Sequence, residues 1–299
     1  MEFRGRNLQV AIDENDLDQK EVFHYTSIEA LHSIIKTQKI RLSSTMYLND
    51  NLEFALVEEL LQEEKLKSYN VEYNKERVDF LNKILDDFKE REAFVCSFSK
   101  HSDMLSQWRG YGDNSQGVCI GFKVNEFAKT LQENTKKYRA TLTVKNQLID
   151  MARLQLFPVI YDIKEQYKKL NVNQSKEHNE NPAYITNHVL WLLSKAVMMK
   201  SDSFKEEAEI RLSYFPDMYV EHNKLMINGN LNQLQYRVQD GRLIPYFELP
   251  ISIGRLLSSI TLGPNCRVTE RELFRFLRSN NLSLSEDKIL RSSSSYKIN

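Results

Sequence analysis

The stretch from Glu21 to Glu53 constrains the fold of this chain more than any other, because it places a short helix between two short strands. Side chains of a strand alternate, so a strand over residues 22–25 turns Val22, His24 and the following Thr26 to one face. A strand with His and Thr on one face borders either the core or a polar site. On its own the stretch does not decide between these two interpretations.

The helix and the second strand follow from local spacing. Thr26 and Glu29 have the three-residue spacing of a capping box, and the apolar residues predict a helix over residues 27–37. Residues 40–42 predict a strand in which Arg41 faces away from its two apolar neighbours. A polar loop follows, which holds Asn49, Asp50 and Glu53.

Strands and helices alternate irregularly along the rest of the chain. The predicted strands include 94–99, 118–124 and 205–215, and the predicted helices include 183–199 and 269–280. Irregular alternation favours an α+β domain with a mixed or antiparallel central sheet over a regular parallel wound sheet. We expect residues 1–299 to form a single domain, with a helical insertion at 52–92 and a flexible loop at 164–182.

Composition excludes some classes of protein. The 41 basic residues balance the 41 acidic ones, so net charge gives no reason to expect binding to nucleic acid or to a membrane surface. The three cysteines, Cys96, Cys119 and Cys266, are far apart and lie in apolar runs, which argues against a disulfide framework and against a zinc knuckle. The polar N-terminus has no apolar signal core, and we therefore expect a cytoplasmic protein with no membrane segment.

The predicted strand 205–215 carries unusual polar chemistry. Read with a period of two, Glu207, Glu209 and Arg211 share one face, although strands tend to avoid Glu. One interpretation is a solvent-exposed charge ladder on the wet side of an antiparallel sheet. The other is a catalytic Glu whose pKa is lowered by the neighbouring Arg. The spacing alone is compatible with both.

Two further groups of residues leave alternatives open. Trp108 and Tyr111 precede a Gly-rich loop, where they form either core packing or a stacking wall for a flat ligand ring. A Mg²⁺ site is compatible with a second group: Asn49, Asp50, Glu53, Glu207 and Glu209. The sequence contains no P-loop, no dinucleotide glycine fingerprint and no serine nucleophile elbow. Nothing in the spacing of the Asn, Asp and Glu residues demands a metal ion, and we expect none.

Several motifs together resemble a known family. They are FHYTS at 23–27, LxxIIxxxxIRLSS at 31–44, ND followed by a Glu at 49–53, CSFSKHSDMLSQWRGYGDNSQGVCIGF at 96–122, EEAEIRL at 206–212 and LGPNC at 262–266. The pattern is similar to that of the bacterial domain-of-unknown-function family 2971, and the resemblance spans most of the chain. The family name implies no activity.

A second resemblance does imply an activity. A strand-borne His, a mid-chain Tyr or Ser and a late-strand Glu-x-Glu are similar to the His-Tyr-Glu arrangement of ADP-ribosyltransferases, including toxins that modify DNA. This resemblance implies a split ADP-ribosyltransferase-like core. The resemblance implies that His24 holds the adenosine ribose of NAD and that Glu209 binds the nicotinamide ribose. It further implies that Tyr111 or Tyr25 stacks on nicotinamide and that Arg41 or Arg211 meets the pyrophosphate. Glu207 would act in catalysis. Thr26 and Trp108 would complete the cofactor site.

The expected function is therefore that of an NAD-using ADP-ribosyltransferase-like enzyme, either a transferase or an NAD glycohydrolase. NAD is its expected substrate, with a nucleic acid or a protein as possible acceptor. Analogy with the second family places it in bacterial anti-phage defence or in a toxin system. Two alternatives remain, a metal-dependent nuclease and a non-catalytic nucleotide-binding module.

Overall fold

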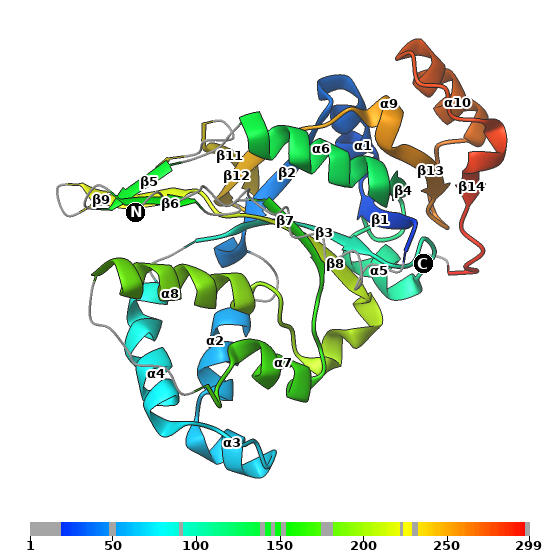
Figure 1. Ribbon diagram of the computed structural model, residues 1–299. Helices are drawn as coiled ribbons and strands as arrows, with labels where there is room; N and C mark the ends of the chain where they lie inside the picture. The colour runs from blue at the N-terminus through cyan, green and yellow to red at the C-terminus, as the bar shows by residue number, and fades with distance from the viewer. Residues whose placement is uncertain are drawn as a thin grey trace.

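The computed structural model describes residues 19–47, 52–89, 92–137, 141–144, 147–150, 154–174, 182–221, 224–228 and 233–296. Within these ranges the protein is a mixed α/β fold built on an open, mostly antiparallel sheet of ten strands (Figure 1). The expected α+β class with a mixed or antiparallel central sheet is confirmed. Whether the whole chain is one domain stays a prediction.

The main sheet follows the order β11-β12-β2-β3-β1-β4-β13-β14, with β8 and β7 joined to it at β3. The strands are β1 (Glu21–Thr26), β2 (Lys39–Ser44), β3 (Phe94–Ser99), β4 (Val118–Lys123), β7 (Leu154–Pro158), β8 (Glu209–Tyr214), β11 (Gln235–Gln239), β12 (Arg242–Pro250), β13 (Leu257–Leu262) and β14 (Ile289–Arg291). The β13–β14 pair is parallel. Two antiparallel hairpins lie outside this sheet, β5 (Thr141–Val144) with β6 (Gln147–Asp150), and β9 (Asp217–Glu221) with β10 (Lys224–Asn228).

The sheet forks at β3. On one side β3 pairs with β8 along its whole length, from Phe94 to Ser99. On the other side its first two residues pair with β2, and its last residue pairs with Phe23 of β1. Among the described strands, the three residues in between have no ladder partner on that side. The fork therefore leaves an opening between β1 and β2, floored by the middle of β3.

One face of the sheet is covered by α1 (Ile28–Thr37), α6 (Val124–Lys137), α9 (Ile253–Leu256) and α10 (Glu270–Ser279). Leu31, Ile34 and Ile35 of α1 are buried in the same apolar cluster as the strands beneath them. Their i, i+3, i+4 spacing is what an amphipathic helix needs to bury one stripe. This cluster is the core on which the cavity-lining strands rest.

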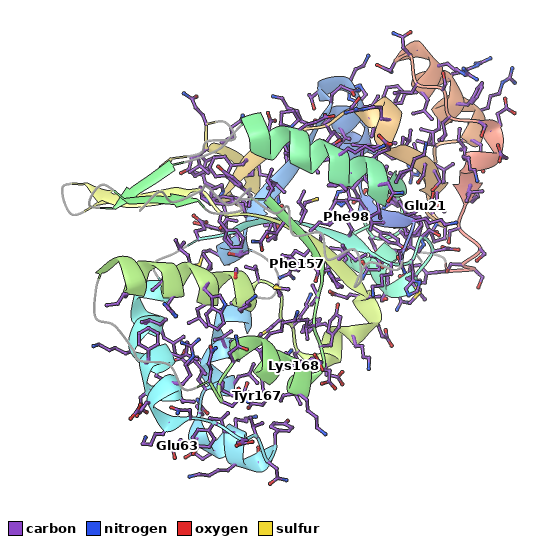
Figure 2. The ribbon with its side chains drawn as sticks, in the orientation of Figure 1. Glu21, Glu63, Phe98, Phe157, Tyr167 and Lys168 are labelled. Atoms are coloured by element: carbon purple, nitrogen blue, oxygen red, sulfur yellow. The ribbon has the colours of Figure 1, made fainter. Side chains whose placement is uncertain are left out.

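A second apolar cluster lies across the sheet from α6 (Figure 1). It is formed by α2 (Leu52–Leu60), α3 (Glu63–Ser68), α4 (Lys75–Lys89), α7 (Ile163–Leu170) and α8 (Pro182–Ala196). Figure 2 labels Phe98 of the first cluster, on β3, and two residues of the second cluster, Phe157 on β7 and Tyr167 on α7. The predicted insertion 52–92 therefore holds α2 to α4, and these helices pack with α7 and α8 from later in the chain.

The predicted cap of α1 is wrong by one residue. Ser27 caps the helix, and its hydroxyl accepts a hydrogen bond from the backbone N–H of Ala30 at 3.2 Å. Thr26 is instead the last residue of β1, because the β1–β4 ladder continues as far as the Thr26–Val118 pair. Pairing in the sheet keeps the Thr26 backbone extended and moves the cap one residue on.

The predicted flexible loop 164–182 is also partly wrong. Residues 163–170 form α7, and the carboxylate of Asp162 caps it by accepting hydrogen bonds from the N–H groups of Lys164 and Glu165 at 2.9 and 3.0 Å. Tyr167 and Leu170 are buried in the second cluster. The Asp162 cap and this apolar spacing are the signals in the sequence that predict the helix. Residues 175–181 lie outside the described part.

Candidate functional site

The opening at the fork of the sheet is a cavity of about 300 Å³. Its walls come from β1, α1, β2, β3, the end of α5 (Leu105–Gly110) and the residues around β8, with β11 and β12 at one end. The predicted site residues that line it are His24, Tyr25, Thr26, Arg41, Tyr111, Glu207 and Glu209. Trp108 and Arg211, which the second resemblance also implies as site residues, do not line it.

Glu207 and Glu209 lie close together, but the prediction that they share one strand is wrong. Glu207 ends a short 3₁₀ helix, Asp202–Glu207, and Ala208 then turns through the left-handed region with a φ of 43°. The strand β8 begins at Glu209. The turn at Ala208 brings both carboxylates to the cavity from different elements, because the alternation of a continuous strand no longer applies.

The polar face of β8 is not a solvent-exposed charge ladder, since every residue of the strand is buried. Glu209 and Arg211 form a two-pronged ion pair in which Nε and Nη2 of Arg211 each donate to a different oxygen of Glu209 at 2.9 Å. Arg211 also donates from Nη1 to the carbonyl of Val197 at 3.0 Å. Burial raises the pKa of Glu209, but the charge and hydrogen bonds of Arg211, together with the charge of Lys200 and a hydrogen bond from Ser97, hold the pKa below its usual value. Glu209 is therefore a buried carboxylate that stays charged.

Lys200 joins the two acidic residues. Its Nζ lies 2.5 Å from Glu207 and 3.5 Å from Glu209, and its side chain is almost fully buried. On its other oxygen, Glu207 accepts a hydrogen bond from the hydroxyl of Tyr111 at 3.0 Å. Burial, followed by the charge of Glu207, raises the pKa of Tyr111, so that this hydroxyl keeps its proton. Sequence reasoning misses Lys200, because a single Lys after a long apolar helix carries no motif.

His24 occupies the middle of the fork. Its Nδ1 lies 2.9 Å from the carbonyl oxygen of Ser97, which is in the unpaired part of β3. A carbonyl can only accept, so Nδ1 carries the proton and Nε2 is left as an acceptor. Burial lowers the pKa of His24, which keeps the ring neutral. His24 thus provides a neutral acceptor in the cavity wall.

Tyr25 and Trp108 have mainly a structural role in this arrangement. The two rings meet edge to face with centroids 4.7 Å apart, and Trp108 is fully buried. The Tyr25 hydroxyl donates to the carbonyl of His101 and accepts from the N–H of Met104, both at 2.9 Å. Of the two tyrosines that the resemblance offers for stacking, Tyr111 is 40% exposed and Tyr25 only 6%, so Tyr111 is the one with a ring face available to a ligand.

The opposite end of the cavity is basic. Lys39 and Arg41 of β2 line it together with Arg237 of β11 and a single carboxylate, Glu248 of β12, among the described residues. Lys39 forms an ion pair with Glu248 at 2.6 Å, and the Arg41 guanidinium lies 4.8 Å from the centroid of the Tyr246 ring. Arg237 is not foreseen from the sequence, because it lies on a short polar edge strand far from the motifs.

The described geometry lends no support to a metal site. Within the described ranges, no group of three or more His, Cys, Asp or Glu side chains is placed to hold a metal ion. Glu207 and Glu209 are engaged by Lys200 and Arg211. Asn49 and Asp50 lie outside the described residues, as does the side chain of Glu53.

The fold and cavity define a mixed α/β protein with a polar site at a fork in its sheet. Residues 107–212 match the model of a family described as "Protein of unknown function (DUF2971)", which supports the first resemblance over that segment. The matched segment contains Tyr111, Glu207, Glu209 and Arg211. A search of curated proteins and a search of solved structures each found no match. Within the described residues, none of the helices combines the length and apolar character needed to span a membrane.

Proposed function

We propose that this protein is an NAD-using enzyme of the ADP-ribosyltransferase type, acting either as a transferase or as an NAD glycohydrolase. The observation that carries the proposal is the convergence of His24, Tyr111 and Glu209 on one cavity. These residues come from β1, from the end of α5 and from β8, so only the fold brings them together. The match to a family of unknown function is compatible with this activity and does not argue for it.

The reaction breaks the bond between C1′ of the ribose and the nitrogen of nicotinamide. The electron pair of that bond leaves with nicotinamide, which departs neutral, and the ribose takes on the positive charge of an oxocarbenium-like state. Water or a nucleophile on an acceptor then bonds to C1′ and gives up one proton. A fixed carboxylate beside the ribose stabilises the positive charge as it develops.

Glu209 suits this role because it is charged, buried and held in place by Arg211. Each of its oxygens accepts one bond from Arg211, and one of them also accepts a long bond of 3.5 Å from Lys200, so the fixed negative charge of Glu209 is what stabilises the ribose. Glu207, which is less buried and lies on the same wall, accepts the proton of the incoming nucleophile. Glu209 therefore serves the first half of the reaction and Glu207 the second.

The neutral residues position the ligand. The Nε2 acceptor of His24 receives a hydroxyl of the adenosine ribose, and the exposed ring of Tyr111 stacks on nicotinamide. Because the Tyr111 hydroxyl donates a hydrogen bond to Glu207, this bond fixes the position of the Tyr111 ring relative to the Glu207 carboxylate. We further propose, from the resemblance, a cytoplasmic bacterial protein that modifies a nucleic acid or a protein in defence against phage or as a toxin.

The test is incubation of the purified chain with NAD, alone and with DNA, RNA or protein acceptors, with nicotinamide release and the mass gain of the acceptor as readouts. Glu209→Gln and His24→Asn should abolish nicotinamide release. The matched control is Glu206→Gln, which alters an exposed neighbouring carboxylate and should leave the activity unchanged. Glu207→Gln should suppress transfer to an acceptor more than it suppresses cleavage of NAD.

The alternatives predict different outcomes. Tight binding of NAD without nicotinamide release would indicate a nucleotide-binding module. Cleavage of nucleic acid that requires Mg²⁺ and stops on chelation would indicate a nuclease. If the wild-type chain neither consumes NAD nor modifies any acceptor, the proposed activity is wrong.

A further inference from the structure

The basic end of the cavity has a geometry of its own. Along β2 the side chains of Lys39, Arg41 and Ser43 alternate with buried Ile40 and Leu42. The two apolar residues anchor the strand in the core, so the three polar ones face the cavity that they line. β2 thus presents a row of two cations and a hydroxyl.

Arg237 reaches this row from the edge of the sheet. It lies on β11, which is separated from β2 by β12, yet its Nη1 donates to the hydroxyl of Ser43 at 3.0 Å. Its neighbours Tyr236 and Val238 are exposed on the opposite face of β11. The Nε of Arg237 is buried and has no hydrogen-bond partner among the described residues. A buried guanidinium N–H that is left unpaired is costly, which makes it a donor that favours a ligand.

The charges at this end are not balanced. At this end, Lys39, Arg41 and Arg237 meet one carboxylate among the described residues, Glu248, which pairs with Lys39, while Glu207 and Glu209 line the other end. Burial lowers the pKa of Arg237, and the positive charge of Arg41 lowers it further, so the two guanidinium groups act on one another as like charges. An anion between them would relieve this repulsion and accept hydrogen bonds from both.

The basic and acidic ends of the cavity are close enough for one ligand to contact both. The thiol of Cys96, on β3 between them, has a pKa raised to about 12, first by burial and then by the charge of Glu209, while Arg237 acts in the opposite direction. Both charged groups therefore act on one side chain. Val95 pairs with Ser43 at one end of β3 and Ser99 pairs with Glu209 at the other, a separation of about 13 Å for four residues of strand. The side chains of Arg41 and Arg237 extend from their strands, so the distance between the basic groups and the carboxylates that a ligand must span depends on these side chains as well as on the backbone.

We propose that Arg41, Arg237 and Ser43 form an anion subsite that binds the phosphate groups of a diphosphate ester. The inference deepens the proposed function and rests on it for the identity of the rest of the ligand. The diphosphate lies against the two guanidinium groups at the β2–β11 end, and the sugar that follows it lies beside Glu209. Planar guanidinium groups suit this role because each can donate two parallel hydrogen bonds to a phosphate.

The experiment measures binding of inorganic pyrophosphate, and separately of ADP and adenosine, by titration calorimetry. The wild-type chain should bind pyrophosphate and ADP saturably, and adenosine much more weakly than ADP. Arg237→Gln and Arg41→Gln should each weaken pyrophosphate binding at least tenfold. The matched control is Arg242→Gln, at the exposed hairpin end of β12 and outside the cavity, which should bind as the wild type does.

Two further measurements keep the result interpretable. Arg41 is exposed, so its variant reports on binding even if Arg237→Gln unfolds, and thermal unfolding without ligand identifies such a loss. Absence of saturable pyrophosphate binding to the wild type, or equal weakening by Arg242→Gln, overturns the subsite.

The failures of the two proposals are distinguishable. If NAD is not cleaved but pyrophosphate binds in a way that requires Arg237, the proposed activity is wrong and the anion subsite is supported. If NAD is cleaved and neither arginine variant weakens pyrophosphate binding, the subsite alone is wrong.

Discussion

Glu209 and Arg211, two positions apart on β8, form an ion pair with two hydrogen bonds of 2.9 Å in a strand that is buried throughout. Their side chains are only 6% and 1% exposed. Moving both charges out of water is costly, and the paired geometry offsets that cost only while both partners are present. The ion pair with Arg211 therefore keeps the charged carboxylate of Glu209 in the buried cavity wall, where an unpaired carboxylate would be too costly.

The first prediction is that this pair is strongly coupled. Arg211→Met leaves a buried carboxylate whose remaining cationic neighbour, Lys200, lies 3.5 Å away, and should lower the free energy of unfolding by roughly 3–5 kcal/mol. The double variant Glu209→Gln/Arg211→Met should recover part of that loss, because it removes the uncompensated charge. Urea denaturation of the wild type, both single variants and the double variant gives the coupling energy. Additive effects of the two substitutions would contradict the prediction.

The second prediction concerns His24 and pH. Its pKa in the folded protein lies below the ordinary value of 6.5, because burial disfavours the charged ring. Below pH 6.5 the unfolded state therefore binds more protons than the folded state, and stability falls as the pH falls, until the pKa of the folded state is reached. The slope contributed by one proton is at most about 1.4 kcal/mol per pH unit.

The check is the free energy of unfolding measured between pH 7.5 and 5 by chemical denaturation. His24→Asn, which can keep the hydrogen bond to Ser97, should flatten the slope in this range. His32→Asn, at an exposed position on α1, should leave the slope as in the wild type. An unchanged slope in His24→Asn would mean that another group is responsible.

Local pattern accounts for much of the fold. The run FVCSFS predicts β3 at both of its bounds, because aromatic and β-branched residues favour a strand. The same reasoning finds β1, β4 and α1 to within two residues. Where it fails, another interaction overrides the local signal, as when pairing with β4 moves the helix cap from Thr26 to Ser27.

The site is only partly accessible to such reasoning. Motif resemblance singles out His24, Tyr111 and Glu209, because their residue types and order carry the signal. Arg237 and Lys200 carry no motif. Arg237 reaches the cavity only across β12, and Lys200, which follows α8, contacts the two acidic residues without lining the cavity itself. Arg211 is named correctly as the partner of Glu209, but its burial depends on strands that pair on both sides of β8.

The third prediction concerns Ala208, the turn that separates Glu207 from Glu209. Its φ of 43° lies in the left-handed region, where a residue with a Cβ pays roughly 1–2 kcal/mol. Ala208→Gly removes this strain at a smaller cost in chain entropy, and should raise the free energy of unfolding by about 0.5–1 kcal/mol. Ala128→Gly, in the interior of α6, is a control expected to have the opposite sign. A loss of stability in Ala208→Gly would contradict the argument.

The C-terminal segment is tied to the start of α5 through Asp103. This carboxylate accepts hydrogen bonds from the indole N–H of Trp108 at 2.7 Å, from the hydroxyl of Ser292 at 2.5 Å, and from the N–H and hydroxyl of Ser293 at 2.8 Å each. Arg109 also lies over the ring of Tyr296, 4.3 Å from its centroid. The tail therefore braces the helix whose last turn leads to Tyr111.

The fourth prediction is that Asp103→Asn loosens this brace. An amide presents one acceptor where the carboxylate presents two, and its NH₂ group would face donors, so several bonds are lost together. We expect a decrease of about 1–2 kcal/mol in the free energy of unfolding, faster proteolysis of the tail, and a change in the fluorescence of Trp108. Asp113→Asn, at an exposed turn position nearby, should change none of these. If the tail and Trp108 were independent, Ser292→Ala would affect proteolysis of the tail without any change in Trp108 fluorescence, and that outcome would refute the brace.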